Sequence, residues 1–319
     1  MGFSWANKTV AVTGGAGSFG RAFVRSILRQ PIRSVRVISR DEFKHAQMQR
    51  EFNDPRIRYL LGDVRDRDRL LLAFDGIDVV VHAAALKRVE KGESDPLEFV
   101  RTNVTGAENV IHAAREHGVD RVVALSSDKA CAPTTLYGAT KMLAERLFVA
   151  ANVYTPNSTK YGCVRYGNVT GSRGSLIPLL LEQRKTGRVT LTDPRMTRFW
   201  MHMDEAVELV KWTVENMAGG EVVVPRLPSV RITDVIEAVA PGCEVDVIGL
   251  RSIEKLHEQM IAADEWRNVQ EQDGRYVIRV GSIFDEAGHE FAYSSETNTD
   301  FLTVAAIRDR YESALAEAA

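Results

Sequence analysis

Short apolar runs rich in β-branched residues recur along the first half of the chain, about every 20 to 40 residues. The runs are apolar almost throughout instead of alternating with polar residues, which is typical of strands buried on both faces of a parallel sheet. They predict strands at Thr9–Val12, Ser34–Ser39, Arg58–Leu61, Asp78–His82, Arg121–Leu125 and Gly162–Arg165.

Helical patterns lie between these runs, most clearly at Pro96–His117 and Tyr137–Val153. Regular alternation of strands and helices indicates a parallel sheet covered on both faces by helices. The sequence therefore predicts an α/β fold with a Rossmann-type doubly wound sheet.

The alternation becomes less regular after about residue 170. The later patterns predict helices at Leu176–Thr186 and Asp204–Met217, a strand at Val189–Leu191, strand or helix segments at Glu221–Val224, Ile232–Val239, Val245–Ile248 and Ile253–Ala263, and a terminal helix after a linker. We therefore predict one domain over residues 1–170, to which some later segments return, and a smaller mixed α/β lobe with a C-terminal tail over residues 171–319.

Composition excludes several classes of protein. The net charge of -2 gives no basic surface for nucleic acid. Three cysteines without paired spacing fit a reducing cytoplasm and no disulfide framework, and no short-spaced Cys/His cluster suggests a metal site. The N-terminus has no long apolar run, so we expect neither a signal peptide nor a membrane span.

A glycine-rich loop follows the first predicted strand. The stretch "TGGAGSFG" contains Gly14, Gly17, Ser18, Phe19 and Gly20. Glycine at a strand-to-helix junction lets backbone N–H groups approach a pyrophosphate at the helix N-terminus. The spacing alone is weak evidence, but its place on the first strand favours a dinucleotide site.

The end of the second strand indicates which dinucleotide binds. "SRDEFK" places Ser39, Arg40 and Lys44 where NAD sites usually have an acidic residue for the ribose. A hydroxyl and a guanidinium suit a 2′-phosphate, so we predict NADP in preference to NAD. In the alternative, Arg40 is a surface charge and Asp41 holds the ribose.

Two further strand ends are expected to face the same dinucleotide. Asp63 and Val64, in "GDVRD", follow the third strand and would meet the adenine. Ala83, Ala84 and Ala85 follow the fourth strand, and their small side chains would let the backbone run close to the dinucleotide.

The stretch "SSDKACAPTTLYGATK" places Tyr137 and Lys141 four residues apart on one helix face. A lysine charge lowers the pKa of a nearby phenol, so the tyrosinate can take a hydroxyl proton while hydride leaves for a nicotinamide. The pair follows the fifth strand, where the carboxyl ends of parallel strands gather ligands.

These motifs together resemble the extended short-chain dehydrogenase/reductase superfamily. More narrowly, the chain is similar to the UDP-N-acetylglucosamine 4,6-dehydratases that invert C5 and serve pseudaminic acid and related bacterial sugars. The resemblance also rests on "HAAALKRV", "TNVTGAENVI", "RYGNVTGSRGSLIP", "DPRMTRFWM", "EKLHE" and "YSSETNT", and it covers residues 13 to about 299.

The resemblance implies a carbon–oxygen lyase with a tightly bound, recycled NADP. Tyr137, aided by Lys141, would deprotonate the C4 hydroxyl of the sugar, and Asp128 would protonate the departing C6 hydroxyl. Lys129 would remove the C5 proton. That role needs a neutral amine, so burial or a nearby cation, such as Lys141 or the nicotinamide, would have to lower the lysine pKa from about 10.4. In the alternative, Lys129 only pairs with Asp128.

The resemblance also implies where UDP-N-acetylglucosamine binds. Tyr166 and Asn168 would lie at the nicotinamide end of the site. The residues expected to contact the sugar nucleotide are Lys87, Ser127, Asn168, Arg173, Thr192, Arg198, Arg251 and Glu254. Ile253 stands where the family commonly has glycine, which affects how Arg251 is aimed.

Two residues near these motifs have a simpler interpretation. Cys131 lies beside the candidate acid–base pair, but the chemistry needs no nucleophile, so we expect it to pack in the core. His82 ends a buried strand and is expected to be a hydrogen-bonded core histidine.

Relatives assemble as dimers or hexamers, so we expect a homo-oligomer. Two other functions stay open: a capsule-type 4,6-dehydratase/5-epimerase, and a non-catalytic NADP-binding regulator on the same fold.

Overall fold

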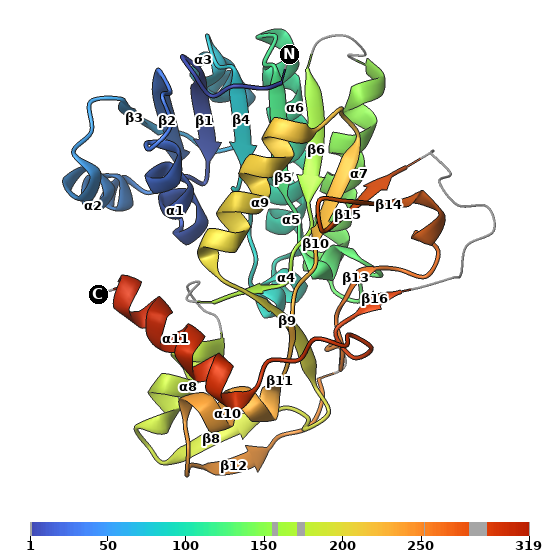
Figure 1. Cartoon of the computed structure of the whole chain (residues 1–319). Coiled ribbons are helices and arrows are strands. Elements are labelled where there is room, and N and C mark those ends of the chain that lie inside the picture. Colours follow the sequence, from blue (N-terminus) through green and yellow to red (C-terminus); the bar gives the residue numbers. More distant parts are fainter. Residues whose placement is uncertain (1, 155–158, 171–175, 252, 281–291, 319) are drawn as a thin grey trace.

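A computed structural model describes residues 2–154, 159–170, 176–251, 253–280 and 292–318 (Figure 1). Its centre is a nine-stranded sheet with the order β14-β15-β10-β6-β5-β4-β1-β2-β3. The strands are β1 (Thr9–Thr13), β2 (Ser34–Ser39), β3 (Ile57–Leu61), β4 (Val79–His82), β5 (Arg121–Leu125), β6 (Lys160–Val164), β10 (Glu221–Pro225), β14 (Val269–Gln272) and β15 (Arg275–Arg279).

The first six strands are parallel and confirm the predicted Rossmann-type sheet. Each predicted strand agrees with the observed one to within two residues. After β6, strand β10 joins in parallel, and β15 and β14 extend the sheet in antiparallel orientation. Three strands from beyond residue 170 thus lie in the large sheet.

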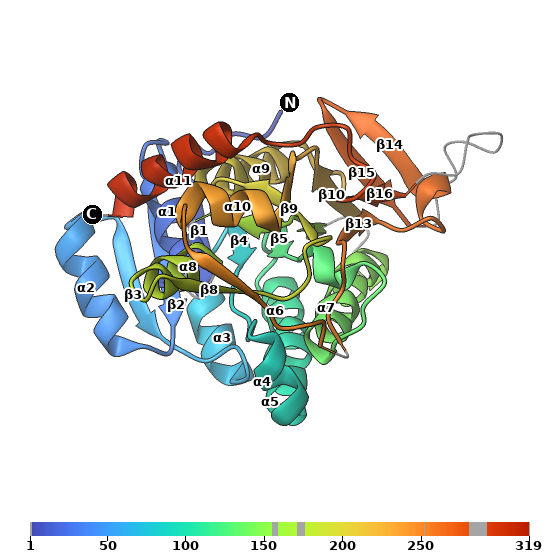
Figure 2. The same cartoon turned by 90° about the horizontal axis from the view of Figure 1, so that it is seen from below.

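Helices cover both faces of this sheet (Figure 2). On one face, α1 (Ser18–Ile27) and α9 (Met203–Asn216) pack on alternate strand residues such as Val10 and Val12. On the other, α3 (Arg67–Phe74), α6 (Gly106–Glu116) and α7 (Leu136–Tyr154) pack on Ala11 and its neighbours. Since successive strand residues point to opposite faces, burial of both explains the apolar runs.

The region predicted as one helix over Pro96–His117 is divided. It contains α5 (Pro96–Phe99), a π-helical segment (Val100–Thr105) and α6, and a further short helix, α4 (Val89–Ser94), precedes it. The chain stays helical throughout, but the hydrogen bonds of the middle segment span five residues instead of four. A periodic sequence pattern does not reveal such a change of register.

A smaller lobe lies at the carboxyl end of the sheet (Figure 1). Its core contains Leu180, Val189, Trp200, Val235 and Ile307. Its elements are β7 (Asn168–Val169), α8 (Leu176–Arg184), β8 (Arg188–Leu191), β9 (Thr197–Met201), β11 (Ser229–Arg231), α10 (Ile232–Val239), β12 (Glu244–Val247) and α11 (Val304–Ala318).

The segment predicted at Ile253–Ala263 differs from the expectation of a regular element. Only β13 (Gln259–Ile261) is a strand, and it pairs antiparallel with β16 (Tyr293–Ser294). The residues before β13 run as an irregular segment along the lobe.

Among the residues that the structure describes, no helix is long and apolar enough to cross a membrane. The remaining helical elements are α2 (Glu42–Phe52) and the 3₁₀ turns Asp128–Ala130 and Trp266–Asn268.

A buried ion network joins the sheet to the segment after β13. Arg165, just beyond β6, bonds to Glu145 of α7 at 2.5 Å and to Glu265 at 2.8 Å, and donates to the carbonyl oxygen of Met260 at 2.7 Å. Burial alone would raise the pKa of Glu265, but the bonds to Arg165 hold it below its usual range. The two carboxylates therefore depend on one guanidinium.

Replacing Arg165 with leucine should leave both glutamates buried without a counter-charge. We expect the free energy of unfolding to fall by about 3–5 kcal/mol, measured by urea denaturation. The control is Arg188→Leu, which removes an exposed pair with Asp246 at 2.8 Å and should cost about 0–1 kcal/mol. Equal losses in the two variants would contradict the assigned role of Arg165.

Candidate active site

The carboxyl ends of the parallel strands open onto a cleft of about 1940 Å³, which extends to the lobe segment around residues 251–258. Every residue expected to hold the dinucleotide lines this cleft. These residues are Gly14, Gly17, Ser18, Phe19, Gly20, Ser39, Arg40, Lys44, Asp63, Val64, Ala83, Ala84, Ala85, Tyr137, Lys141, Tyr166 and Asn168.

The glycine-rich loop packs closely against the end of β4. Gly14 has φ +67°, and a Cβ there would lie 2.8 Å from the backbone of Ala84. Only glycine fits both the backbone conformation and this contact. Gly17 is the N-cap of α1, so the free N–H groups of that helix begin at the cleft. This arrangement fits a bound diphosphate.

At the end of β2, the guanidinium of Arg40 faces the cleft, whereas the carboxylate of Asp41 is bonded within the protein. The Asp41 carboxylate caps α2: Oδ1 accepts the N–H of Lys44 at 3.0 Å, and Oδ2 lies 2.5 Å from Lys44 Nζ. Arg40 is exposed in the cleft, 3.5 Å from Asp63. Ser39 Oγ lies 2.7 Å from His45 Nε2. The alternative role of Asp41 as a ribose ligand therefore competes with its role as a helix cap.

The candidate acid–base residues lie on two elements in direct contact. Asp128 and Lys129 form a 3₁₀ turn after β5, and Tyr137 lies in the first turn of α7. Thr135 Oγ1 accepts the N–H of Gly138 at 3.1 Å, as an N-cap residue does. A Cβ at Gly138 would lie 2.3 Å from the carbonyl oxygen of Lys129. Glycine therefore lets α7 begin directly against the 3₁₀ turn.

Lys141 is held against the end of β5. Its Nζ donates to the carbonyl oxygen of Leu125 at 2.5 Å, and burial lowers its pKa. Burial also raises the pKa of Tyr137, while the charge of Lys129 and a hydrogen bond with Ser127 act in the opposite direction. The charge of Lys129 is therefore one of the influences that favour the Tyr137 phenolate.

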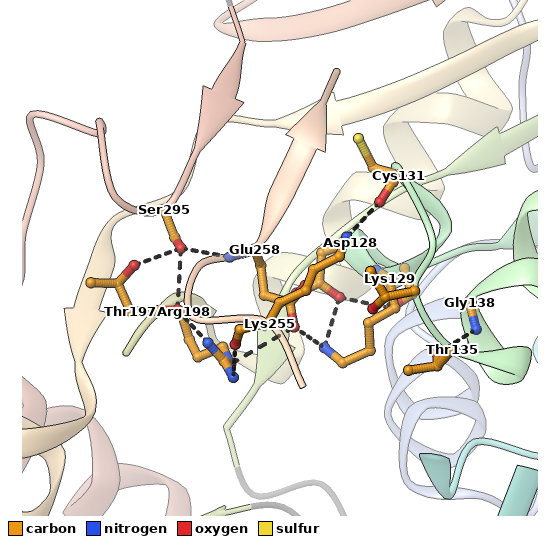
Figure 3. A network of polar contacts seen from close by, with 12 residues as sticks. Asp128, Lys129, Cys131, Thr135, Gly138, Thr197, Arg198, Lys255, Glu258 and Ser295 are labelled. Atoms are coloured by element: carbon orange, nitrogen blue, oxygen red, sulfur yellow. Dashed lines mark hydrogen bonds and ion pairs between the residues drawn. The ribbon is translucent and has the colours of Figure 1, made fainter. Parts of the chain in front are cut away.

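Lys129 lies between two carboxylates (Figure 3). Its Nζ is 3.1 Å from Asp128 Oδ1 and 3.2 Å from Glu258 Oε1. Burial would lower the lysine pKa, but these two charges raise it above its usual range, against the smaller effect of Arg198. The predicted lowering of this pKa is wrong, because it considered nearby cations and not a second carboxylate.

Glu258 is the main residue that sequence reasoning missed. In "EKLHE" the resemblance singles out Glu254, whereas Glu258 is the residue that reaches Lys129. It lies just before β13 and is 3% exposed. The useful signal in the sequence is a charged residue at the start of a short apolar strand.

The predicted sugar-nucleotide residues are only partly brought together. Lys87, Ser127, Asn168, Arg198, Arg251 and Glu254 line the cleft. Thr192, which directly follows β8, is not among the lining residues. Arg173 lies outside the described residues.

Two of the predicted arginines have protein partners. Arg251 is exposed and pairs with Glu90 of α4. Arg198 is buried, with Nε 3.8 Å from Glu258, and donates to the carbonyl oxygens of Lys255 and Leu256. Arg198 thus lies beside the acid–base cluster.

Ile253 helps to attach the lobe segment to the loop that follows the 3₁₀ turn. Its carbonyl oxygen accepts from Thr134 Oγ1 at 3.2 Å, and Lys255 Nζ donates to the carbonyl oxygen of Cys131 at 2.9 Å. Both bonds fix the segment that carries Arg251 and Glu258 across the cleft.

The two residues expected to have structural roles are confirmed in the core. His82 is buried, Nδ1 lies 2.7 Å from Thr13 Oγ1, and burial lowers the histidine pKa to about 3. Cys131 is buried, and burial raises its pKa to about 12. Neither residue has the properties of a reactive group at neutral pH.

The cleft combines a glycine-rich loop at a helix N-terminus with a phenol, a carboxylate and an amine. Such a set can exchange hydroxyl and carbon-bound protons beside a dinucleotide. No group of three or more potential metal-ligating side chains occurs in the described part of the chain.

Comparison with known proteins agrees with this geometry. The family described as "Polysaccharide biosynthesis protein" matches residues 10–280. A UDP-N-acetylglucosamine 4,6-dehydratase (inverting) of Campylobacter jejuni serotype O:2 is 43% identical over 293 residues, covering 90% of this chain and 87% of that protein. A UDP-glucose 4-epimerase of Rickettsia conorii is 39% identical, covering 85% of this chain and 83% of that protein.

A solved structure is similar over almost the whole length. The X-ray structure of Pen from Bacillus thuringiensis superimposes with a TM-score of 0.92 at 34% identity, covering 98% of this chain and 99% of that one.

The thiol of Cys131 should resist alkylation in the folded protein. Burial and the raised pKa leave little thiolate at neutral pH, whereas Cys243 is partly exposed. Peptide mass spectrometry after iodoacetamide treatment should find Cys243 modified about tenfold or more faster. Unfolding in urea should remove the difference, and rapid alkylation of native Cys131 would contradict its assignment to the core.

Proposed function

This chain belongs to the polysaccharide biosynthesis protein family of the extended short-chain dehydrogenases/reductases, and we propose that it is an inverting UDP-N-acetylglucosamine 4,6-dehydratase. The product would be UDP-2-acetamido-2,6-dideoxy-β-L-arabino-hex-4-ulose, released together with water. The observation that carries the proposal is the placement of Asp128 and Lys129 against Tyr137 in one cleft.

We propose NADP as the resident cofactor. The loop at Gly14 and the N-terminus of α1 would hold its diphosphate, and Arg40 with Ser39 would hold its 2′-phosphate. The capping role of Asp41 supports this choice over NAD. When bound, the nicotinamide supplies a reversible hydride acceptor, which takes hydride from C4 of the sugar and returns it to C6.

Tyr137 would take the proton of the C4 hydroxyl. The Ser127 hydrogen bond and the Lys129 charge both favour the phenolate that this step requires. Lys141, fixed on the carbonyl oxygen of Leu125, would hold the helix face against the end of β5. Its contribution to Tyr137 would then be one of position.

Asp128 and Lys129 would perform the elimination. Once C4 is a ketone, the C5 proton is acidic, and the Lys129 amine would remove it. Asp128 would protonate the C6 hydroxyl, which leaves as water while the C5–C6 double bond forms. Return of a proton to the other face of C5 would invert that centre. Compared with a simple dehydrogenase, the elimination requires one further acid and one further base, and here adjacent residues would supply them.

The lobe would hold the sugar nucleotide. We assign dinucleotide binding to residues 1–170 and the strands that return to the sheet, and UDP-sugar binding mainly to residues 171–319. Lys87 and Asn168 would face the sugar. Arg251 would exchange Glu90 for the diphosphate, since an arginine fork suits phosphate oxygens. Roles for Arg198 and Glu254 at the sugar nucleotide follow from their place in the cleft.

We further propose a homo-oligomer, dimer or hexamer, that works in the cytoplasm and supplies bacterial surface sugars of the pseudaminic acid type. Free Cys131, Cys163 and Cys243 favour a reducing compartment.

A 4-epimerase is the second candidate, because a relative carries that name. Epimerisation needs hydroxyl deprotonation and hydride exchange at C4 alone, for which Tyr137 and Lys141 suffice. The additional acid and amine of Asp128 and Lys129 would have no task in it, which favours dehydration. A capsule-type dehydratase would share the first product, and a non-catalytic regulator would need none of these four side chains.

Incubation with UDP-N-acetylglucosamine should produce a sugar nucleotide that has lost one water, detected by mass spectrometry. In deuterium oxide the product should carry deuterium at C5, and its NMR ring couplings should show the inverted centre. An unchanged mass with altered C4 stereochemistry would indicate an epimerase, and no reaction would favour a regulator.

Two variants separate the half-reactions. Lys129→Ala should slow water release by about 10²-fold or more, whereas formation of the reduced cofactor in a single turnover should slow much less, because Tyr137 keeps its hydrogen bond with Ser127. Tyr137→Phe should suppress both. Normal water release and C5 exchange by Lys129→Ala would contradict its assignment as the C5 base.

Arg40→Ala should weaken NADP binding by about 10–100-fold, because a charge-assisted hydrogen bond to the 2′-phosphate is lost. Calorimetric titration with NAD of the same variant is the matched control, and NAD affinity should change little. Equal losses for both dinucleotides would contradict the proposed 2′-phosphate site.

A further inference from the structure

We propose that Glu258 is a positioning residue whose carboxylate fixes the Lys129 amine at the cleft and retains in the site the single proton that Lys129 shares with Asp128. The inference rests on the proposed dehydratase function and extends it to a residue of the lobe.

The backbone of Glu258 is held firmly. Its N–H donates to Ser295 Oγ at 3.0 Å, and the N–H of Ser295 donates back to the carbonyl oxygen of Glu258 at 2.8 Å. Ser295 Oγ in turn lies 2.8 Å from Thr197 Oγ1 (Figure 3). These hydrogen bonds fix the backbone of Glu258, so its carboxylate reaches Lys129 from a fixed position.

The two carboxylates around Lys129 are arranged alike. Each gives one oxygen to Nζ, and the second oxygen of each, Asp128 Oδ2 and Glu258 Oε2, is buried without a hydrogen-bond partner among the described residues. A purely structural ion pair normally satisfies its buried oxygens. Unsatisfied oxygens at the edge of a cleft are able to accept a proton or a hydrogen bond from a ligand.

The position of the proton determines what Lys129 can do. As an ammonium between two carboxylates, Lys129 cannot act as a base. Asp128, 3.1 Å away, is the nearest acceptor whose protonated form the reaction needs. Transfer breaks one N–H bond of Lys129 and forms one O–H bond on Asp128. A neutral amine and a carboxylic acid result from one internal step.

This transfer makes the elimination self-contained. The neutral amine takes the C5 proton, and Asp128 gives its proton to the departing hydroxyl to form water. Lys129 is then again an ammonium and Asp128 again a carboxylate. C5 then takes a proton from solvent on its other face, which inverts the centre. Tyr137 releases to solvent the proton that it gained from the C4 hydroxyl, so every group returns to its starting state.

Glu258 decides how firmly the shared proton is held. The charged and titratable groups that face Lys129 are Asp128, Glu258, Arg198 and Tyr137. The site is active while the Lys129–Asp128 pair carries one proton, and it loses activity when rising pH removes that proton. Because Glu258 raises the pKa at which the pair loses it, Glu258 moves this alkaline limit to higher pH.

The test compares Glu258→Gln with Glu258→Asp. Glutamine preserves the shape and can still accept from Lys129, but it removes the charge. We expect its alkaline limit of kcat to fall by about one pH unit or more, which is a tenfold loss at a fixed pH on that limb. Aspartate keeps the charge, so the alkaline limit of Glu258→Asp should equal that of the wild type. Its kcat should decrease, because the shorter side chain holds the Lys129 amine less closely.

Ser295→Ala is the structural control. It removes a bond to the backbone of Glu258 without changing the charge, so it should lower the melting temperature and leave the alkaline limit unmoved. If Ser295→Ala moves the limit as far as Glu258→Gln does, the charge of Glu258 is not the cause and the inference is overturned.

A second measurement needs neither sugar nor cofactor. An amine-selective acylating reagent reacts with the neutral form of Lys129, and peptide mass spectrometry gives its labelling rate across pH. Glu258→Gln should label Lys129 about tenfold faster than wild type at the same pH. Wild-type protein that releases no water from UDP-N-acetylglucosamine would overturn the proposed function and this inference with it. Water release with an unchanged limit and labelling rate in Glu258→Gln would overturn the inference alone.

Discussion

A single lysine ammonium, shared by a carboxylate of the sheet domain and a carboxylate of the lobe, joins the two parts of the molecule at the cleft. Asp128 follows β5, Glu258 precedes β13, and Lys129 lies about 3 Å from both. Buried charges are tolerated only when they are balanced and bonded. Arg198 completes the balance at 3.8 Å from Glu258, so two cations face two anions. This balance lets ionised groups gather beside a pocket.

A second ionic contact between sheet and lobe has a different task. Arg165 bonds to Glu145 and Glu265 where its side chain is 3% exposed. The side chain of Lys129 is 28% exposed and lines the cleft. The chemistry of the two contacts is the same, but only Lys129 can meet a ligand. The deeper network fixes the β13 segment on the sheet, and this segment then carries Glu258 to the cleft.

The parts that the sequence predicts well depend on short-range relations. The apolar strands, the loop at Gly14 and the Tyr137–Lys141 spacing each follow from residues within one turn or one strand. Glu258 is different, because it stands 129 positions after Lys129 and meets it only in the folded chain, just before β13. The predicted pKa of Lys129 was wrong for the same reason. The widened helix at Val100–Thr105 has no periodic signal, and nothing local in the sequence shows that Thr192 lies outside the cleft.

A raised pKa at Lys129 is consistent with a base at that position. A more basic amine has a larger driving force to remove a carbon-bound proton, provided that the neutral form can be produced. In bulk solvent that form would be rare at neutral pH. In the proposed mechanism the acceptor is Asp128, one residue away, and the proton it receives is the one that the leaving hydroxyl requires. The same proton transfer therefore produces both the base and the acid, and it involves only these two neighbouring side chains. Glu258 strengthens the amine as a base without competing for the leaving group, because its fixed backbone places it on the lobe side of Lys129.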